Sequence, residues 1–345
     1  MELENCILIA GPCAAETAGQ LETTAKEIFQ NRVPISYFRA GVWKVRSNPK
    51  DFSGAGVPSL QWLKEIKEKY QIPVCTEVIR GEQIAWCVEH GMDAVWIGAR
   101  TTVNPFLVQE IAEAVQQHPI KVFIKNPITP DLKLWIGAIE RMIKAGAPEV
   151  MVIHRGFQNN SENLFRNAPL WEIPIALKTE FPDLKIICDP SHIAGNTQFI
   201  PEIAQLALDY GFDGLMIETH HDPKNALSDA KQQVTPLELK QLIDNLQFKS
   251  KITSEMERDL MLLRNQIAHI DTQVGGLLFK RMQLVDQLAK VKAKHNLSII
   301  QPDQWKKAME KYQHVAPEDA LFQQFIRQYL ELLHQASIDR QNKVK

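Results

Sequence analysis

The sequence has no hydrophobic run long enough to cross a membrane and no charge bias that would favour nucleic acid. A membrane-spanning helix needs about 18 consecutive apolar residues. The segment Met1–Ile9 carries acids where a signal peptide would carry basic residues. The net charge of −2 gives no attraction to polyanions or to an anionic membrane. We therefore expect a cytoplasmic protein with no nucleic-acid partner and no membrane partner.

Cysteine is also scarce. The five cysteines all precede position 190, and their spacing does not suggest a disulfide framework, so we expect reduced thiols. Hydrophobic residues make up 45% of the chain and charged residues 23%, which is the balance of an ordinary globular protein. At roughly 150 residues per domain, the length suggests about two domains.

Short apolar runs recur along the first part of the chain, with room for a helix between them. They are Cys6–Ala10, Ser36–Arg39, Pro73–Glu77, Ala94–Gly98, Lys121–Lys125, Glu149–His154, Lys185–Asp189 and Gly214–Glu218. Amphipathic segments fill the gaps, and several end in a glycine that suits a helix stop, such as Gly91, Gly146 and Gly211. Eight strand–helix units predict a (β/α)8 barrel over residues 1–246. A doubly wound sheet would favour a glycine-rich first turn, which Gly11-Pro12-Cys13 is not.

The pattern changes after residue 246. No proline occurs from Ser254 to Lys294, and apolar residues recur there at heptad spacing. They are Leu260, Leu263, Ile267, Ile270, Val274, Leu277, Leu284, Leu288 and Val291, which we call the apolar seam. Two shorter helical stretches follow, around Pro302–Tyr312 and Pro317–Arg340. We predict a linker over 247–253 and an all-α domain over 254–345 that dimerises through its long helix.

Charged and metal-ligating residues stand where the predicted strands end, and in a barrel these ends meet at one mouth. Basic residues suited to phosphate and carboxylate groups are Arg39, Lys44, Arg46, Arg100, Lys125 and Arg155. A thiol, an imidazole and two carboxylates suit a first-row divalent ion: Cys13, His192, Glu218 and Asp229. So many cations at one mouth predict two anionic substrates, at least one of them with both carboxylate and phosphate groups.

The ordered motifs at these positions resemble the β subgroup of type I 3-deoxy-D-arabino-heptulosonate 7-phosphate (DAHP) synthases. They are Gly11-Pro12-Cys13, Arg39-Ala-Gly-Val-Trp-Lys44-Val-Arg46-Ser47, Ile97-Gly-Ala-Arg100-Thr101, Ile124-Lys125-Asn126, His154-Arg155-Gly156, Asp189-Pro-Ser-His192 and Ser228-Asp-Ala-Lys-Gln-Gln-Val-Thr-Pro236. The resemblance covers roughly residues 5–246. It implies a condensation of phosphoenolpyruvate with erythrose 4-phosphate.

The resemblance assigns roles residue by residue. The divalent metal, manganese first with iron, cobalt or zinc as alternatives, would be held by Cys13, His192, Glu218 and Asp229. Phosphoenolpyruvate would be held by Arg39, Lys44, Arg100, Lys125 and Arg155. Arg46 and Ser47 would meet the aldose phosphate, while Glu77 and Asp189 would support the reacting water and the aldehyde.

One motif departs from the family. The usual Lys-Pro-Arg-Thr reads Lys44-Val45-Arg46-Ser47, which keeps the two cations but loses the fixed φ of proline. We expect a less preorganised aldose loop with activity retained. A sister family makes an eight-carbon sugar acid phosphate from arabinose 5-phosphate, with an asparagine before the corresponding arginine. The Lys-x-Arg spacing favours the four-carbon acceptor, and a 3-deoxy-octulosonate 8-phosphate-type synthase is the alternative.

The long helix of the second domain carries a cation in phase with its apolar seam. Arg281 falls on the seam, and a buried cation there would need an anion. Lys292 lies about 16 Å further along the helix and nearly in register, so both could reach one dianion. Arg264 lies about 42 Å from Lys292 and could serve only a site shared with a partner chain.

This arrangement resembles the all-helical chorismate mutases, which are intertwined dimers. Leu263-Arg264 through Asp271, Lys280-Arg281 and Lys290–Lys292 match the first helix, and Ala336–Gln341 matches the last. By this resemblance chorismate would be bound by Arg264 of one chain and by Arg281, Lys292 and Gln341. The intervening loop departs from the family's charged residues at Gln301, Gln304 and Trp305, so we expect mutase activity at a reduced level.

Together these features predict a bifunctional enzyme of aromatic amino acid biosynthesis, a transferase and an isomerase, that forms a homodimer through its helical domain. The two reactions are not consecutive in the pathway, so channelling explains the fusion poorly. We hypothesise instead that prephenate bound to the helical domain inhibits the barrel. The alternative is a tail that only dimerises the synthase or senses a ligand.

Overall fold

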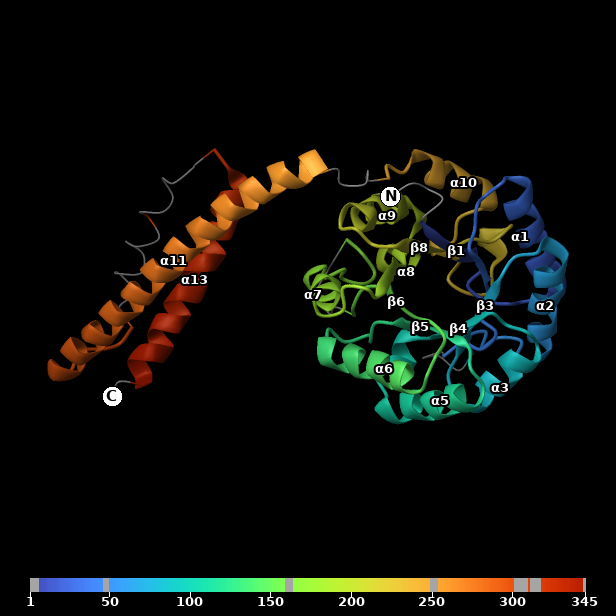
Figure 1. Cartoon of the computed structure of the whole chain (residues 1–345), viewed down its shortest axis with the longest axis horizontal. Helices are drawn as coiled ribbons and strands as arrows, with labels where there is room; N and C mark the ends of the chain where they lie inside the picture. Colours follow the sequence, from blue (N-terminus) through green and yellow to red (C-terminus); the bar gives the residue numbers. More distant parts are fainter. Residues whose placement is uncertain are drawn as a thin grey trace. The chain divides into compact units, whose positions relative to one another are not determined.

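The structure, a computed structural model, describes residues 6–45, 50–158, 164–248, 254–300, 310 and 318–343. The chain divides into two compact units, Met1–Lys251 and Ile252–Lys345. The first contains a barrel of strands surrounded by helices, and the second contains two long helices (Figure 1). Within the described ranges, no helix is both long and apolar enough to pass through a membrane.

The strands of the first unit are all parallel and close into a barrel, each paired with the next and the last with the first. They are β1 (Ile7–Gly11), β2 (Tyr37–Arg39), β3 (Val74–Val78), β4 (Ala94–Ile97), β5 (Lys121–Lys125), β6 (Val150–His154), β7 (Lys185–Cys188) and β8 (Gly214–Glu218). The predicted (β/α)8 barrel is confirmed, and each strand end lies within one residue of its expected position. The apolar runs set these positions because both faces of each strand are covered.

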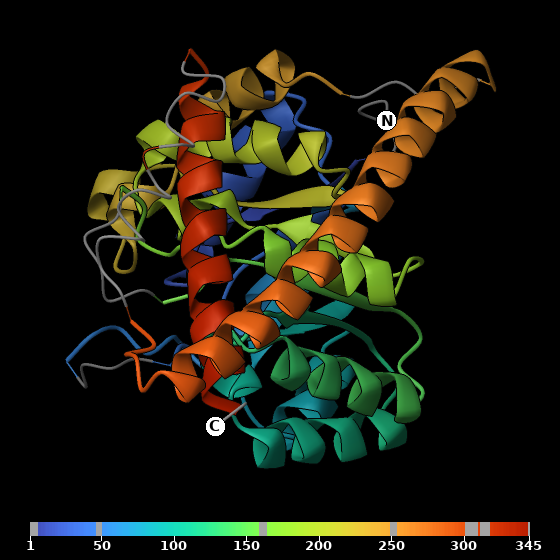
Figure 2. The same ribbon diagram turned by 90° about the vertical axis from the view of Figure 1, so that its left-hand side faces the viewer.

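Helices lie around the outside of the barrel (Figure 2). They are α1 (Ala18–Gln30), α2 (Pro58–Tyr70), α3 (Glu82–Glu89), α5 (Pro105–Gln117), α6 (Leu132–Lys144), α7 (Glu172–Glu180), α9 (Ile200–Asp209) and α10 (Pro236–Asn245). Two short helices, α4 (Ala99–Thr102) and α8 (Pro190–Ala194), directly follow the carboxyl ends of β4 and β7. Short 3-10 turns are η2 (Thr197–Phe199), η3 (Pro223–Asn225) and η4 (Ala230–Gln232). Polar caps fix several helix starts: the side chain of Asn104 accepts from α5, that of Asp131 from α6, and Thr235 with Glu238 forms a capping box on α10.

The core of the barrel has two layers. Residues that point outward from the strands pack against the helices in one large apolar cluster. Residues that point inward form a second cluster inside the barrel, which includes Tyr37, Trp96, Phe123 and Met216. Inward-facing side chains fill the barrel, so the polar residues at the carboxyl ends of the strands rest on a solid floor.

The second unit pairs α11 (Ser254–Lys294) with α13 (Ala320–Lys343). Arg281 contacts Ser337, and Asp286, which lies further along α11, contacts Arg340, which lies further along α13. The two helices therefore run in the same direction. Val285, Ala289 and Leu330 are buried between them. The predicted middle helix, around residues 302–312, falls outside the described residues except for Glu310.

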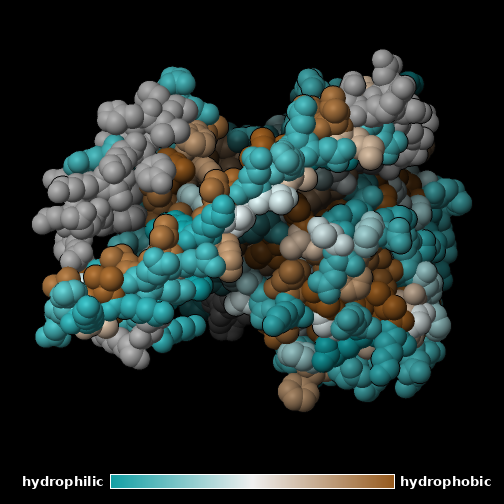
Figure 3. Space-filling model, turned by 60° about the vertical axis from the view of Figure 1, so that its left-hand side comes forward, coloured by the Kyte–Doolittle hydropathy of each residue, from teal (hydrophilic) through white to brown (hydrophobic). Residues whose placement is uncertain are grey.

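The apolar seam of α11 does not pack against α13. Its residues are 36–65% exposed within one chain: Leu260, Leu263, Ile267, Ile270, Val274, Leu277, Leu284, Leu288 and Val291. In the space-filling view, apolar side chains lie at the surface of this unit among hydrophilic ones (Figure 3). A contiguous exposed apolar stripe of this kind marks a surface that binds another protein surface.

Closure of the barrel depends on the absence of a side chain at the first residue of β8. A Cβ placed on Gly214 would lie 2.1 Å from the carbonyl oxygen of Ile7, which is its partner in β1. We expect Gly214→Ala to lower the free energy of unfolding by about 3 kcal/mol, the upper end of the usual cost of overpacking, because a paired strand cannot move aside.

Urea unfolding followed by tryptophan fluorescence measures this change in the barrel, since six of the seven tryptophans precede residue 172. Gly19→Ala is the matched control, because nothing lies within 4 Å of its added Cβ in α1. The control gains up to about 1 kcal/mol from helix propensity. Equal stability of the two variants would contradict the close contact.

Candidate active site

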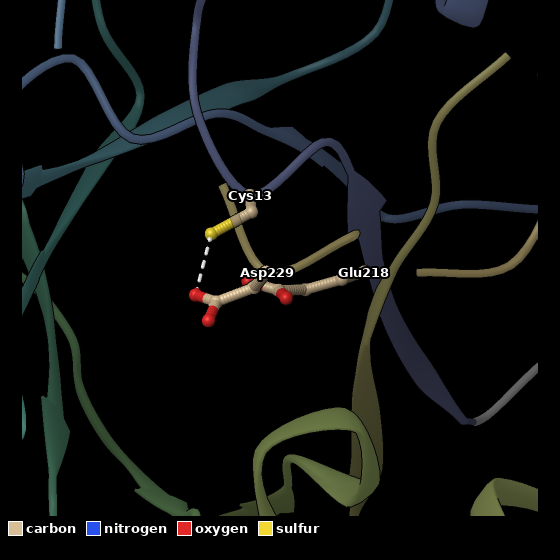
Figure 4. A group of neighbouring side chains, drawn as sticks. All are labelled: Cys13, Glu218 and Asp229. Carbon is tan, nitrogen blue, oxygen red and sulfur yellow. Dashed lines mark hydrogen bonds between the residues drawn. The ribbon is translucent and has the colours of Figure 1, made fainter. Parts of the chain in front are cut away.

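Three potential metal ligands meet at the carboxyl ends of β1 and β8. Cys13 follows β1, Glu218 ends β8, and Asp229 lies in the loop after β8. Their ligand atoms all lie within 4.8 Å of one another, and the Cys13 thiol donates a hydrogen bond to Asp229 Oδ2 at 3.2 Å (Figure 4). Cys13 and Glu218 are fully buried, so a positive ion would find little competing water there.

His192 lies beside this group. Its Nε2 is 3.8 Å from Glu218 Oε1, and its Nδ1 is 2.8 Å from Asp189 Oδ2. The two residues share a short helix, because the Asp189 side chain caps the start of α8 and accepts from the His192 backbone. Burial lowers the pKa of the imidazole, so the ring is neutral at pH 7 and Nε2 can offer a lone pair.

The donor set fits a first-row divalent ion: a thiol sulfur, an imidazole nitrogen and two carboxylate oxygens. The thiol must lose its proton to act as a ligand. Burial and the nearby Glu218 charge raise the pKa of Cys13 to about 12. Without an ion the thiol therefore keeps its proton and donates a hydrogen bond to Asp229. A divalent cation in this position would supply the charge that the thiolate needs.

A cavity of about 300 Å³ opens next to this group. Thirteen residues line it, and they include five cations: Lys44, Arg100, Lys125, Arg155 and Arg166. The acids of the lining are Asp51, Glu77 and Asp229, so cations outnumber acids and the cavity suits a small molecule with several negative charges. Positive groups in a partly enclosed cavity attract such a molecule more strongly than they would in open water.

Buried cations beneath the cavity are paired with the acids of the same site. Arg39 is fully buried and donates from Nη1 to Glu218 Oε1 and from Nη2 to the carbonyl oxygen of Cys13, both at 3.0 Å. Lys125 Nζ donates to Asp189 Oδ2 at 2.8 Å. Burial pulls the pKa of Arg39 down, but the surrounding negative charges, with Glu218 first, raise it above its usual value.

Lys44 links the thiol with the carboxylate that the sequence placed near the reacting water. Its Nζ is 3.2 Å from Cys13 Sγ and 3.8 Å from Glu77 Oε2. Glu77 reaches this position because residue 98 is glycine: a Cβ there would lie 2.1 Å from Glu77 Oε1. A side chain at position 98 would therefore displace the Glu77 carboxylate from this place.

Among the residues that the structure describes, Arg155 has no acidic partner as close as those of Lys125 or Arg39. Its Nη1 donates to Asn167 Oδ1 at 2.8 Å and more weakly to the carbonyl oxygen of Gly156. Burial, together with the positive charges of Arg166 and Arg100, lowers the pKa of Arg155 to about 10. The cavity thus carries an excess of positive charge that a bound anion would relieve.

Three residues without a predicted role contact the ligand group, which consists of Cys13, Glu218 and Asp229. Arg166 Nη1 donates to Asp229 Oδ1 at 3.0 Å and to Gln232 Oε1 at 2.7 Å. Gln232 in turn donates to Glu218 Oε2, and Gln233 accepts from the Cys13 backbone. Gln232 and Gln233 stand in the Ser228–Pro236 motif and were within reach of prediction. Arg166 lies twelve residues after His154, and no periodicity marks it.

Two of the predicted residues, Arg46 and Ser47, fall outside the described residues. The other predicted residues of the barrel lie around the cavity or directly beneath it. Cys13, Glu218 and Asp229 form one group, while His192 lies beside it.

The helical unit has a polar cluster between α11 and α13. Arg281 Nη1 donates to Ser337 Oγ at 2.8 Å, and Lys292 Nζ donates to the carbonyl oxygen of Ile299 at 2.6 Å. Gln341 is buried, and its Oε1 has no hydrogen-bond donor in the described part of the chain. Ser337 was not among the predicted site residues, although it lies one turn before Gln341 on the same face of α13.

Arg264 does not join this cluster within one chain. It is exposed on α11, 17 residues before Arg281 and so about 25 Å from it along the helix. Gln301, Gln304 and Trp305 fall outside the described residues.

Two family profiles match the chain, one over each unit. The DAHP synthetase I family matches residues 3–257, and chorismate mutase type II matches residues 263–342. A phospho-2-dehydro-3-deoxyheptonate aldolase of Thermotoga maritima is 27% identical over 239 residues, which cover 69% of this chain and 68% of the relative. A 2-dehydro-3-deoxyphosphooctonate aldolase of Legionella pneumophila is 25% identical over 272 residues, covering 73% of this chain and 94% of the relative.

Solved structures give the same picture. A crystal structure of the Thermotoga maritima DAHP synthase superposes with a TM-score of 0.61 at 26% identity and covers 71% of each chain. The residues matched by the two profiles correspond closely to the barrel unit and to the helical unit. The chain therefore belongs to the DAHP synthetase I family and carries a chorismate mutase type II domain after its barrel, so that one polypeptide is both a DAHP synthase and a chorismate mutase.

Proposed function

We propose that the barrel condenses phosphoenolpyruvate with erythrose 4-phosphate at a divalent metal held by Cys13, His192, Glu218 and Asp229. The observation that carries this proposal is the group of ligand atoms within 4.8 Å at the edge of a cationic cavity. Manganese is our first choice of ion, and iron, cobalt and zinc suit the same ligands. The unpaired, buried cysteines of the barrel suit the reducing cytoplasm as its compartment.

The cations bind and orient the first substrate. Arg39, Lys44, Lys125 and Arg155 would surround the carboxylate and phosphate of phosphoenolpyruvate, with Arg100 at the cavity wall. Arg46 and Ser47 would receive the phosphate of the aldose. Holding two polyanions in contact offsets their repulsion and removes the entropy cost of their encounter.

The reaction forms one carbon–carbon bond and releases phosphate. Carbon 3 of phosphoenolpyruvate attacks the aldehyde carbon, water adds at carbon 2, and the phosphate leaves from carbon 2. The metal would act as a Lewis acid toward the aldehyde. Glu77, whose Oε2 is 3.8 Å from Lys44 Nζ, would hold the water. Asp189 would orient the aldehyde, and its contacts with His192 and Lys125 support this role.

A synthase assay with erythrose 4-phosphate and with arabinose 5-phosphate, each with and without a chelator, tests the proposed function. We expect turnover of the four-carbon aldose, loss of activity after chelation and recovery when a divalent ion is added. Cys13→Ser should weaken metal binding by about a hundredfold or more, since even residues that only support a ligand cost about 10–100-fold.

Titration calorimetry in buffers of different ionisation enthalpy adds a reading independent of activity. Because the pKa of Cys13 is about 12 before binding, ligation releases its proton, and affinity rises with pH through the neutral range. Cys87→Ser, at a buried thiol in α3, is the matched control and should bind metal normally. Preference for arabinose 5-phosphate would support the eight-carbon alternative, and activity that survives chelation would rule out the metal.

We propose that the mutase site is formed by two copies of the chain through the apolar seam. The seam is exposed within one chain, and the polar cluster around Arg281 lacks the fourth predicted residue, Arg264. A partner's α11 packed on the seam would bury the stripe and supply that arginine. Arg281, Lys292 and Gln341 would then bind the carboxylates and ether oxygen of chorismate, and Gln341 would do so through its Nε2, since these groups only accept hydrogen bonds.

We expect Leu277→Glu to separate the dimer into monomers and to lower mutase activity about a hundredfold or more, because an unpaired charge would be buried in the interface. Synthase activity of the barrel should remain. Analytical ultracentrifugation and chorismate disappearance, both on the full chain, measure the two effects. Thr272→Glu, on the opposite side of α11, is the control. A monomeric variant with full mutase activity would show that the site needs no partner.

We further propose that prephenate bound in the helical unit inhibits the barrel. The support is the fusion itself, since two non-consecutive reactions gain little from proximity, whereas a product sensor gains control of the pathway. Saturating prephenate should slow the condensation at substrate concentrations near KM, and Arg281→Ala should remove this inhibition. The control Arg327→Ala, on an exposed part of α13, should keep it. An unchanged rate in the wild-type enzyme would refute the sensor.

A further inference from the structure

Trp96 lies inside the barrel, directly beneath the cations of the active site. It belongs to β4, its side chain is fully buried, and it packs in the inward-facing apolar cluster with Phe123 and Tyr37. The guanidinium carbon of Arg39 is 4.7 Å from the centre of its ring, and the ammonium nitrogen of Lys125 is 5.9 Å away. One aromatic ring thus faces two buried cations.

The ring face completes the surroundings of Arg39. The two terminal nitrogens of this guanidinium donate to Glu218 and to the Cys13 carbonyl, while its Nε has no acceptor among the residues that the structure describes. Hydrogen bonds in the guanidinium plane limit sliding, and the ring limits motion out of that plane. The attraction between a cation and an aromatic face is strongest for tryptophan and grows when water is excluded, as it is here.

The indole nitrogen of Trp96 cannot explain its presence. Trp96 Nε1 is buried without an acceptor in the described ranges, and such an unsatisfied donor costs free energy. Phenylalanine would fill an apolar core without that cost. Trp135 is the other fully buried tryptophan among the described residues, and it differs because its Nε1 donates to the carbonyl oxygen of Ile124. The feature that sets Trp96 apart is therefore its contact with two cations.

We propose that Trp96 is a positioning residue of the synthase: its ring fixes Arg39 and Lys125 in the geometry that receives the anionic substrate. This rests on the proposed function, in which both cations bind phosphoenolpyruvate. The ring acts from below and does not touch the substrate. Because Arg39 donates to Glu218, the ring also helps to fix this potential metal ligand. The same aromatic side chain therefore supports both the anion site and the ligand group.

The test varies the electrostatics of the ring at almost constant shape. Mono-, di- and trifluorinated tryptophan, placed at position 96 of the full chain by suppression, weaken cation attraction stepwise. We expect the Kd for phosphoenolpyruvate, measured by titration calorimetry, to rise with each fluorine to about tenfold overall. The same series at position 135 is the matched control and should leave the Kd unchanged, since no cation lies over that ring in the described chain.

Thermal unfolding of each variant separates positioning from a purely structural role. A structural role would lower the melting temperature without the graded change in Kd, and a Kd that stays flat across the series at position 96 would overturn the proposal. Failure of the unsubstituted protein to bind phosphoenolpyruvate would instead overturn the proposed function. Trp96→Phe, compared with Trp135→Phe, repeats the comparison with ordinary residues and should weaken binding only at position 96.

Discussion

The buried ion pair between Arg39 and Glu218 holds the active site together. Neither side chain is more than 1% exposed, and they meet at 3.0 Å across the mouth of the barrel. Removing either charge from water alone would be costly, so each makes the burial of the other tolerable. Glu218 is one of the potential metal ligands, and Arg39 is one of the cations expected to hold the anionic substrate. This contact therefore couples the position of the metal ligands to that of the cations.

The lysines of the site are also paired with acceptors of the same site. Lys125 is held by Asp189, and Lys44 is shared among the Cys13 carbonyl, its thiol and Glu77. These pairings keep the two lysines in place where they line the cavity. Burial depresses the pKa of Arg155 to about 10, with a further contribution from the positive charges of Arg166 and Arg100.

The sequence was informative wherever one local pattern decided the structure. Short apolar runs such as Lys121–Lys125, which alternate with amphipathic segments, indicate covered parallel strands. Their polar ends meet because the strands of a parallel barrel share one mouth. Arg166 was missed because a loop residue twelve positions past a strand follows no period. Trp96 suited a core strand whether or not cations lay over it, since burial says nothing about what faces a ring. In α11 the heptad pattern located the apolar seam, but only coordinates show that α13 packs on a different face.

The site joins the two ends of the barrel's own chain. Gly11 pairs with Glu218 in the ladder between β1 and β8, and Cys13 follows that pair directly. More than 200 residues separate the thiol from its carboxylate neighbours, so the ligand group has a very high sequence separation. During synthesis on the ribosome it cannot exist until the last strand has emerged and closed on the first. A metal bound by this group would therefore require a finished barrel and could not guide its early folding.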